Sequence, residues 1–306
     1  MKCVVSTLIM FNIVKLPTHL RKWKMIETII GDYPTEITQQ QVDFIDRENF
    51  YTFGKILTDD EIIEGRFAYA RVWEANPLAE EQRAGDGVPG HPSMKIESYC
   101  HEPALAKLIA NEYILRIASA ALHTPVDELV YVDGYMHRQR LYARWDYCDW
   151  SWDGWHLDGA PNIDPLTHCN VWMYFNDCTR DEGVTQALLG GCEKQRENIR
   201  AGYPDGDRWE PGNIQDGIQA MIDEVGHDPD KGTWAVAPAG GGLAWGGFLW
   251  HRIAPNRSGI NRTLVTYEYA PRSADHKTEF KDRTTAELRE SILPMLPDDK
   301  HYLLDY

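Results

Sequence analysis

The spacing of apolar residues changes along the chain, from a helical period in the first third to an alternating one later. Thr38 can cap a first helix. Thr58 and Glu61, three residues apart, form the capping-box pattern that opens a second helix to about Val72. Between these helices, Phe50–Ile56 predicts a short strand.

A longer helix is predicted from Pro103 to about Leu122, because proline is favoured in the first turn of a helix. Its apolar positions recur near helical spacing, at Leu105, Leu108, Ile109, Leu115 and Ile117. Helices of this kind usually pack on a sheet, and we assign this one no chemical role.

From Glu128 onward the apolar positions alternate, which is typical of strands. Strands are predicted at 129–136, 139–145, 170–176, 232–237, 242–245 and 262–269, and further helices near 214–225 and 285–293. In the strand 170–176, Val171, Met173 and Phe175 alternate with Trp172 and Tyr174. Helices followed by many short strands predict an α+β fold with a mainly β core, a sandwich or a barrel.

Three segments follow from this pattern. Residues 1–34 are predicted to be an N-terminal extension, and residues 35–306 a single domain. Residues 194–232 interrupt the strands as a polar, Gly- and Asp-rich insertion with one helix, and we do not treat them as a separate domain.

The composition is that of a soluble globular protein, with 43% apolar and 25% charged residues. The formal charge of −16 disfavours binding to nucleic acid or to an anionic membrane. Six cysteines without a C-x-x-C pair favour reduced thiols in a cytoplasmic protein. The apolar stretch from Cys3 to Val14 is too short to span a bilayer. A monomer and a homodimer both remain open.

The first candidate for chemistry is His156-Leu157-Asp158, which lies between Gly154 and Gly159. A histidine and a carboxylate two residues apart on a strand point to the same side and can chelate one metal ion. Alone the pair is weak evidence, and the alternative is a histidine that is hydrogen-bonded for structural reasons.

The second candidate is His251, which follows a Gly-rich and aromatic run, and the strand that begins at Arg262. Arg262 alternates with Leu264 and Thr266, so its face is partly apolar. A buried guanidinium favours a carboxylate partner, which it binds in a bidentate manner. The partner is either a carboxylate of a cosubstrate or an internal acid such as Glu268.

With these motifs in view, the chain from about Ile37 to Tyr269 resembles the phytanoyl-CoA dioxygenase-like branch of the Fe(II)/2-oxoglutarate-dependent oxygenases. The opening segment Ile37–Arg66 is similar to the family's N-terminal helix, strand and helix. The motifs that carry the resemblance are Trp155-His156-Leu157-Asp158-Gly159, Asn170-Val171-Trp172-Met173-Tyr174, Asp181-Glu182-Gly183, Leu189-Gly190-Gly191, and Leu249-Trp250-His251 with Asn256, Ser258 and Arg262.

The resemblance implies a double-stranded β-helix, a jelly-roll or cupin-like barrel, flanked by helices. It also implies the residues of the site: Fe(II) ligands His156, Asp158 and His251; cosubstrate residues Arg262, Ser258, Trp172 and Asn170. Two departures stand out. The insertion lengthens the gap before His251, and we expect it to fold over the mouth of the site. Ile253 replaces the small polar residue often found two positions after the distal histidine.

The resemblance further implies a dioxygenase that uses Fe(II), 2-oxoglutarate and O2. Such an enzyme oxidises an unactivated C–H bond of a small-molecule metabolite and converts 2-oxoglutarate to succinate and CO2. Asp158 argues against halogenation, because related halogenases have a small residue there. Hydroxylation, desaturation and oxidative cyclisation stay open. The alternatives are a non-catalytic jelly-roll binding protein and a cupin-type metalloenzyme that does not use 2-oxoglutarate.

Candidates for contact with the substrate are Arg138, Arg140, Trp152 and Trp155. The two arginines share a strand face and can bind an anionic group, or they lie on the outer face of the sheet. The tryptophans either contact the substrate or pack in the core. We predict that His137 and His168 are loop histidines and not additional metal ligands.

Overall fold

The computed structural model describes residues 36–75, 93–95, 99–139, 155, 157, 168–193, 216–254, 256–274 and 286–305. All of them belong to one compact unit, Tyr33–Tyr306. The strands are β1 (Phe50–Phe53), β2 (Ser93–Lys95), β3 (Leu129–Asp133), β4 (Tyr135–Gln139), β5 (Cys169–Tyr174), β6 (Thr185–Ala187), β7 (Thr233–Trp234), β8 (Gly242–Gly246), β9 (His251–Ile253) and β10 (Arg262–Pro271).

The helices are α1 (Gln39–Glu48), α2 (Asp59–Ala75), α4 (Pro103–Ala106), α5 (Glu112–Leu122), α7 (Asp216–His227) and α8 (Ala286–Ile292). Short 3-10 turns are η4 (Lys107–Ala110), η5 (Val126–Glu128), η8 (Arg180–Glu182), η10 (Pro229–Lys231), η11 (Leu293–Met295) and η12 (Asp298–Leu304). None of these described helices is both long and apolar enough to cross a membrane.

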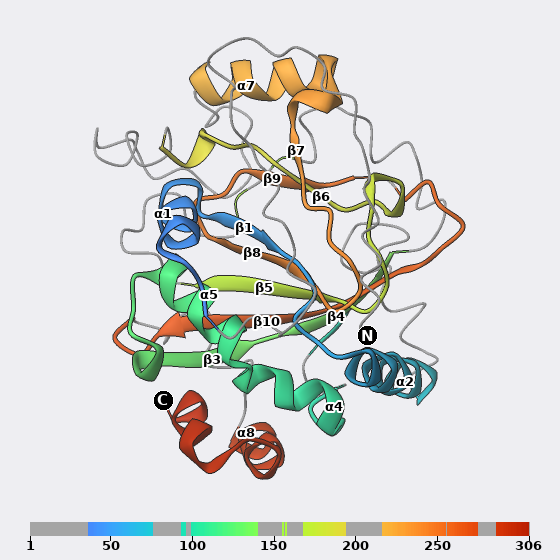
Figure 1. Cartoon of the computed structure of the whole chain (residues 1–306), viewed down its shortest axis with the longest axis vertical. Helices are drawn as coiled ribbons and strands as arrows, with labels where there is room; N and C mark the ends of the chain where they lie inside the picture. Colours follow the sequence, from blue (N-terminus) through green and yellow to red (C-terminus); the bar gives the residue numbers. More distant parts are fainter. Residues whose placement is uncertain are drawn as a thin grey trace, which may run out of the picture. The chain divides into compact units, whose positions relative to one another are not determined.

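The described strands form two antiparallel sheets (Figure 1). The large sheet has the order β1-β8-β5-β10-β4-β2, and β3 pairs with the far end of β10. The small sheet has the order β7-β6-β9. The expected mixture of helices with a mainly antiparallel β core is confirmed, whereas closure into a barrel remains a prediction, because the segment around His156 lies outside the described residues.

The large sheet buries apolar side chains on both faces, as the alternation in 170–176 predicts. Val171, Met173 and Phe175 pack in the core that the helices cover. Trp172 and Tyr174 pack in a second core, which also contains residues of the small sheet. The sheet is therefore the middle layer of the unit.

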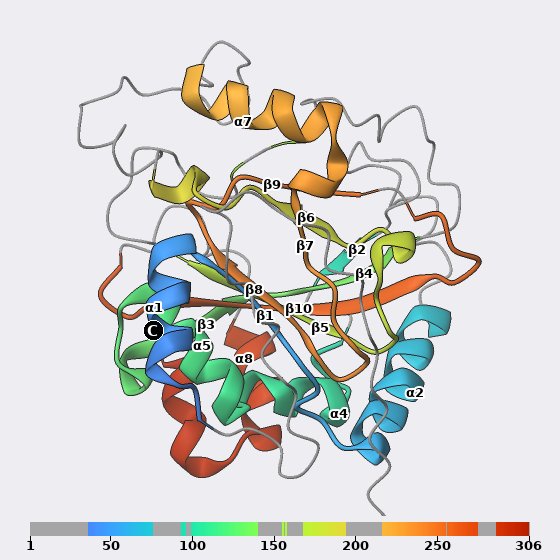
Figure 2. The same ribbon diagram turned by 45° about the horizontal axis from the view of Figure 1, so that its top comes forward.

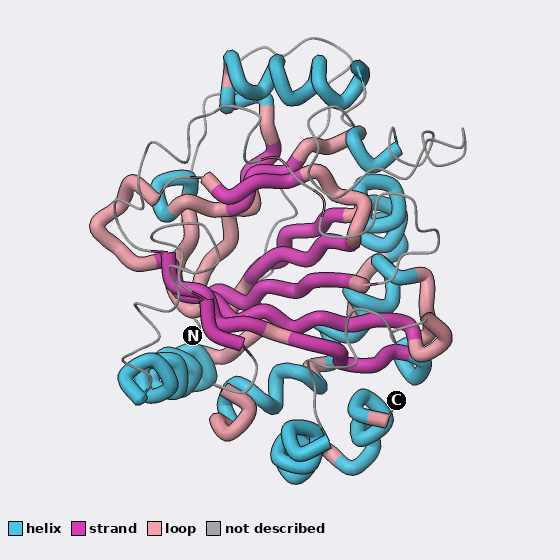
Figure 3. Tube along the Cα trace, turned by 180° about the vertical axis from the view of Figure 1, so that it is seen from behind, coloured by secondary structure: helices cyan, strands magenta, loops and turns pink. Residues whose placement is uncertain are grey.

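The helices are divided between the two sides of this layer. Residues of α1, α2, α4, α5 and α8 contribute to the core on one face of the large sheet. Helix α7 lies beyond the small sheet, far from α4 and α8 (Figures 1 and 2). Seen from behind, the small sheet lies between α7 and the large sheet (Figure 3).

The single helix predicted over 103–122 is wrong in one respect, because it is broken into α4, η4 and α5. Asn111 ends the first part and caps α5, since its Oδ1 accepts from the backbone N–H groups of Tyr113 and Ile114 at 3.0 and 3.2 Å. Two buried hydroxyls of β10 donate hydrogen bonds to backbone carbonyls near the break. Tyr267 donates to Leu105 O, and Tyr269 donates to Ile109 O.

The single strand predicted over 129–136 is also divided, at Gly134. A Cβ at this position would overlap the hydroxyl of Tyr99 and the carbonyl of Thr266. The register of β10 shifts between Glu268 and Tyr269, so that β3 and β4 pair with successive parts of the same strand.

The other predicted elements agree with the structure to within a few residues. Thr38 and Thr58 cap α1 and α2 through capping boxes with Gln41 and Glu61. The strand predicted at 50–56 ends at Phe53. The strand predicted at 139–145 lies outside the described residues beyond Gln139, as do residues 1–34 and the first part of the insertion, 194–215.

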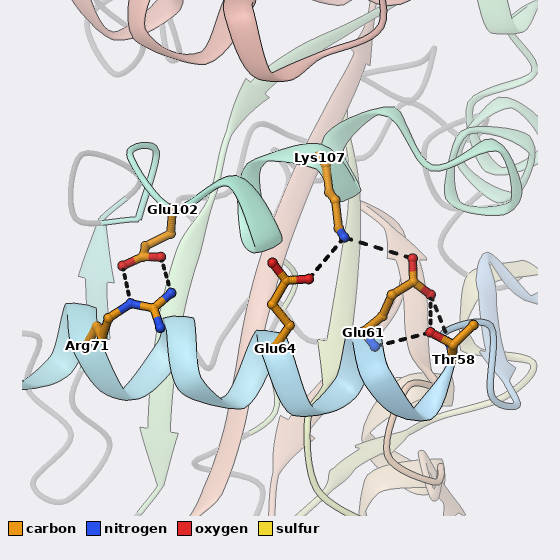
Figure 4. A network of polar contacts seen from close by, with 6 residues as sticks. All are labelled: Thr58, Glu61, Glu64, Arg71, Glu102 and Lys107. Atoms are coloured by element: carbon orange, nitrogen blue, oxygen red, sulfur yellow. Dashed lines mark hydrogen bonds and ion pairs between the residues drawn. The ribbon is translucent and has the colours of Figure 1, made fainter.

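Ion pairs join α2 to α4 and η4 on the surface (Figure 4). Arg71 binds Glu102 at 2.6 Å, and Lys107 lies 3.5 Å from Glu64 and 4.0 Å from Glu61. Exposed ion pairs contribute little to stability, so these contacts orient the helices more than they stabilise the fold.

We predict that Gly242→Ala destabilises the protein by about 1–3 kcal/mol or more, because a Cβ there would overlap the backbone carbonyl of Trp172 on the neighbouring strand. Gly259→Ala is the matched control, since nothing lies within 4 Å of its added Cβ. Urea unfolding measures both variants. Equal stability of the two would contradict the close approach of β5 and β8.

Candidate active site

Polar side chains lie on the face of the large sheet that faces the small sheet. In the register of β10 and β5, Thr266 pairs with Trp172, and Glu268 pairs with Asn170. Cross-strand partners share a face of the sheet, and residues an even number of positions apart on a strand share one too. Arg262 and Thr266, four positions apart on β10, therefore point to the same side. Arg262, Trp172 and Asn170 therefore lie on one side of the sheet.

Arg262 is fully buried. Its Nη1 donates to the carbonyl of Gly183 at 2.6 Å, and its guanidinium lies 5.5 Å from the ring centroid of Trp172. Burial lowers the pKa of Arg262 from its ordinary value. A guanidinium in such surroundings is stabilised when a carboxylate reaches it.

Glu268 is not the direct partner that the alternative interpretation requires. It lies six residues from Arg262 on the same strand, which separates the two by roughly 20 Å. This distance excludes an ion pair between them. Glu268 is therefore not the internal acid that pairs with Arg262.

Two polar neighbours of Arg262 among the described residues, Cys178 and Tyr174, are uncharged. Burial raises the pKa of the Cys178 thiol to about 12 and that of the Tyr174 hydroxyl well above its ordinary value. Both groups therefore stay protonated at neutral pH, and neither supplies a negative charge to Arg262.

Trp172 contacts Arg262 and two other rings on the face of the large sheet that is directed toward the small sheet. Its ring stacks on His137 at 5.5 Å and meets Trp245 edge to face at 4.7 Å. The loop position predicted for His137 is wrong, because this residue lies in β4 opposite Leu264. His168 lies just before β5, outside any strand, and is buried.

His251 begins β9, on the small sheet, and only 2% of its surface is exposed. Its Nδ1 lies 3.0 Å from the carbonyl of Leu249, and its ring lies 5.1 Å from that of Trp245. An Nδ1–H donated to a carbonyl fixes the tautomer in which Nε2 coordinates a metal. The residue thus fits the role of a metal ligand.

His156 and Asp158 lie outside the described residues, but their neighbours Trp155 and Leu157 do not. Both are buried, in one apolar cluster with Trp250, which precedes His251. The structure therefore brings the chain beside His156 to the chain beside His251. Within the described ranges no three ligand-type side chains gather, as expected when two predicted ligands lie outside them.

Thr185 is a candidate that the sequence interpretation missed. It pairs with Ile253 across β6 and β9, so its side chain shares the face of His251. Its hydroxyl is buried and makes no hydrogen bond in the described part of the chain. The resemblance places a small polar residue at the position of Ile253, and Thr185 supplies a hydroxyl from the adjacent strand instead. Only the pairing of two short strands reveals this.

Ser258 lies in the loop before β10. Its Oγ donates to Asn256 Oδ1 at 3.1 Å, and its backbone N–H donates to Asp181 O at 2.9 Å. These contacts hold the loop against η8, which precedes Gly183, the partner of Arg262. They support an indirect role for Ser258, while direct contact with a cosubstrate remains a prediction.

The predicted substrate residues are only partly described. Residue 138 belongs to β4, where its backbone pairs with that of Thr263. Arg140 and Trp152 lie outside the described residues. Trp155 is buried among apolar side chains, which favours packing.

Comparison with known proteins gives a consistent result for the fold. The chain is similar to EvdO2 from Micromonospora carbonacea var. aurantiaca, complexed with 2-oxoglutarate, at 18% identity and a TM-score of 0.53, covering 77% of this chain and 91% of that one. It is similar to the α-ketoglutarate-dependent carbocyclase SnoK from nogalamycin biosynthesis at 16% identity and a TM-score of 0.54, covering 79% and 87%.

HygX from Streptomyces hygroscopicus, with nickel, 2-oxoglutarate and hygromycin B bound, is similar at 15% identity and a TM-score of 0.55, covering 83% and 94%. At these identities the likeness shows the fold alone. No curated protein matched the chain.

The family model of phytanoyl-CoA dioxygenase (PhyH) matches residues 70–264, well over half of the chain. The chain belongs to the PhyH family. It is accordingly a non-heme Fe/2-oxoglutarate-dependent oxygenase, with Fe(II), 2-oxoglutarate and O2 as the family's cofactor and cosubstrates. The PhyH match includes His251 and Arg262, the described residues whose geometry is given above.

In this PhyH protein, the loop of Ser258 packs against η8 beside Gly183, the partner of Arg262. We predict that this packing is less stable at low pH. Burial raises the pKa of Glu182, but hydrogen bonds from the Thr179 hydroxyl and backbone and from Ser258 together lower it below its ordinary value. The stability that this carboxylate contributes is present above its ordinary pKa and is lost as pH falls through the lowered one.

Glu182→Gln should therefore be less stable than the wild type at pH 7, and the gap should narrow as pH falls below about 4.5. Urea unfolding at several pH values measures it. A gap that stays constant over this range would show that the charge of Glu182 does not stabilise the loop.

Proposed function

We propose that this PhyH protein oxidises an unactivated C–H bond of a small-molecule metabolite, with His156, Asp158 and His251 as the Fe(II) ligands. The observation that carries the proposal is the fully buried guanidinium of Arg262. It lies on the face of the large sheet directed toward the strand that begins with His251.

Arg262 binds the distal carboxylate of 2-oxoglutarate, and Thr185 donates a hydrogen bond to the same group. A charged, planar donor and a hydroxyl together suit a carboxylate. Trp172 keeps the cosubstrate on the inner side of the sheet, since its ring closes the space between Arg262 and His137. Ser258 acts from behind, by holding the loop beside Gly183.

The metal ligands come from two segments. The contact between Nδ1 of His251 and Leu249 O orients the ring and would leave Nε2 available to hold the metal. When bound, the iron supplies the activation of O2 that is coupled to decarboxylation of 2-oxoglutarate to succinate and CO2. The buried Trp155 and Trp250 exclude water beside both ligand segments.

The substrate is proposed to be a small molecule. This is supported by the fold relatives, among which HygX binds hygromycin B. Hydroxylation, desaturation and ring closure all start with removal of a hydrogen from the substrate, and its position in the site decides between them. Arg138, Arg140 and Trp152 stay candidates for contacts at the mouth, whereas the buried Trp155 is assigned to packing.

We also propose that the insertion 194–232 covers the site. Its helix α7 directs Ile218, Ile222 and Val225 into the apolar cluster of Trp155 and Trp250. These apolar residues of α7 thus pack beside Trp155 and Trp250, the residues that precede the two proposed histidine ligands. Closure of the two sheets into a barrel is part of this proposal.

We predict that Arg262→Gln weakens binding of 2-oxoglutarate to the Ni(II)-loaded protein by about 2–5 kcal/mol, because a buried charge pair is lost. Thr185→Val should weaken it by about 1.5–3 kcal/mol, because a hydrogen bond to a charged group is lost. Calorimetric titration without O2 measures both. His156→Ala should abolish loading of the metal.

Thr263→Val is the matched control. Thr263 adjoins Arg262 on β10 but faces the other side, where its hydroxyl donates to Asn176 Oδ1 at 2.7 Å. This variant should bind 2-oxoglutarate like the wild type. Unchanged binding in Arg262→Gln would refute the cosubstrate site, and metal binding without 2-oxoglutarate binding would favour a non-catalytic protein.

A further inference from the structure

Arg252 is a buried cation on the side of β9 opposite to His251. Only 3% of its surface is exposed. It directly follows His251, and alternation along the strand turns its side chain away from the face of the metal ligand. A guanidinium is costly to bury unless its charge and its N–H groups are engaged.

The guanidinium of Arg252 lies 4.8 Å from the ring centroid of Trp155, in cation–π geometry. Trp155 directly precedes His156, and it too is buried. Its indole N–H makes no hydrogen bond in the described part of the chain. Within the described part of the chain, Trp155 is held by apolar packing and by the cation over its ring.

Gln186 holds the guanidinium in place from the neighbouring strand. Its Oε1 accepts from Nε and Nη2 of Arg252 at 3.0 and 2.8 Å, and the two residues pair in the register of β6 and β9. Its Nε2 donates to Pro229 O at 2.8 Å, just after α7. A Cβ at Gly232 would overlap the same amide, so the chain packs closely around it.

The contacts form one continuous connection, Trp155–Arg252–Gln186–Pro229. It joins the residue before one predicted ligand, the residue after another, and the end of the covering helix. Apolar contacts alone would let Trp155 slide, whereas a planar cation bound by two hydrogen bonds fixes the ring in one orientation.

We propose that Arg252 is a positioning residue for the metal site, which holds the His156 segment against the strand of His251 through the ring of Trp155. This inference rests on the proposed function, because it takes His156 and His251 as ligands of one metal. Partners outside the ligand set commonly change metal affinity by about 10- to 100-fold.

The test is titration of the full-length, metal-free protein with Co(II), read by its absorption spectrum, which reports both affinity and ligand geometry. Arg252→Met keeps the length and apolar contacts of the side chain but removes the cation. It should bind Co(II) about 10- to 100-fold more weakly and show altered band shapes. Arg252→Lys retains a cation over Trp155 and should recover part of the affinity.

Three outcomes separate the possibilities. A lowered melting temperature of Arg252→Met with the affinity and spectrum of the wild type would show a purely structural role and overturn the inference, while the proposed function stands. Equal losses in the Lys and Met variants would also overturn it, because the cation would not matter. A wild type that binds no Co(II) would overturn the proposed metal site and the inference with it.

Discussion

A guanidinium that lies between two sheets loses its hydration, and protein groups must replace it. The strand order of the large sheet determines which groups lie next to the guanidinium of Arg262. Arg262 begins β10, which pairs with β5 and β4. A slip of one residue would turn Arg262 and Thr266 toward the helices and bring Val265 and Tyr267 into the inter-sheet space. The apolar core under α5 therefore fixes the polar site on the opposite face of the same strand.

The small sheet contributes through its two faces. One face carries His251 and Thr185 toward the large sheet, and the other carries Arg252 and Gln186 toward α7. Because the side chains alternate, a strand of three residues can place a metal ligand on one side and a buried cation on the other. The site and its covering helix are thus connected through the thickness of one sheet.

Much of the fold follows from local patterns. The alternation in 170–176 assigns both faces of β5, because the helix-covered and inter-sheet cores are both apolar. Capping boxes locate the starts of α1 and α2. The break at Asn111 is not predictable, because the hydroxyls of Tyr267 and Tyr269 that accompany it come from a distant strand.

The site divides in the same way. Burial of Arg262 is predictable from its neighbours on one strand, and His251 from the motif around it. Thr185 and Arg252 are not, because their roles depend on the pairing of β6 with β9 and on the packing of Trp155. Such short strands leave no period in the sequence that would show their register.

The most direct measurement is a crystal structure of the protein with Ni(II) and 2-oxoglutarate. The account predicts one metal ion held by His156, Asp158 and His251, and the distal carboxylate of 2-oxoglutarate within hydrogen-bond distance of Arg262 and Thr185. A metal bound by other residues, or a 2-oxoglutarate whose distal carboxylate lies away from Arg262, would contradict it.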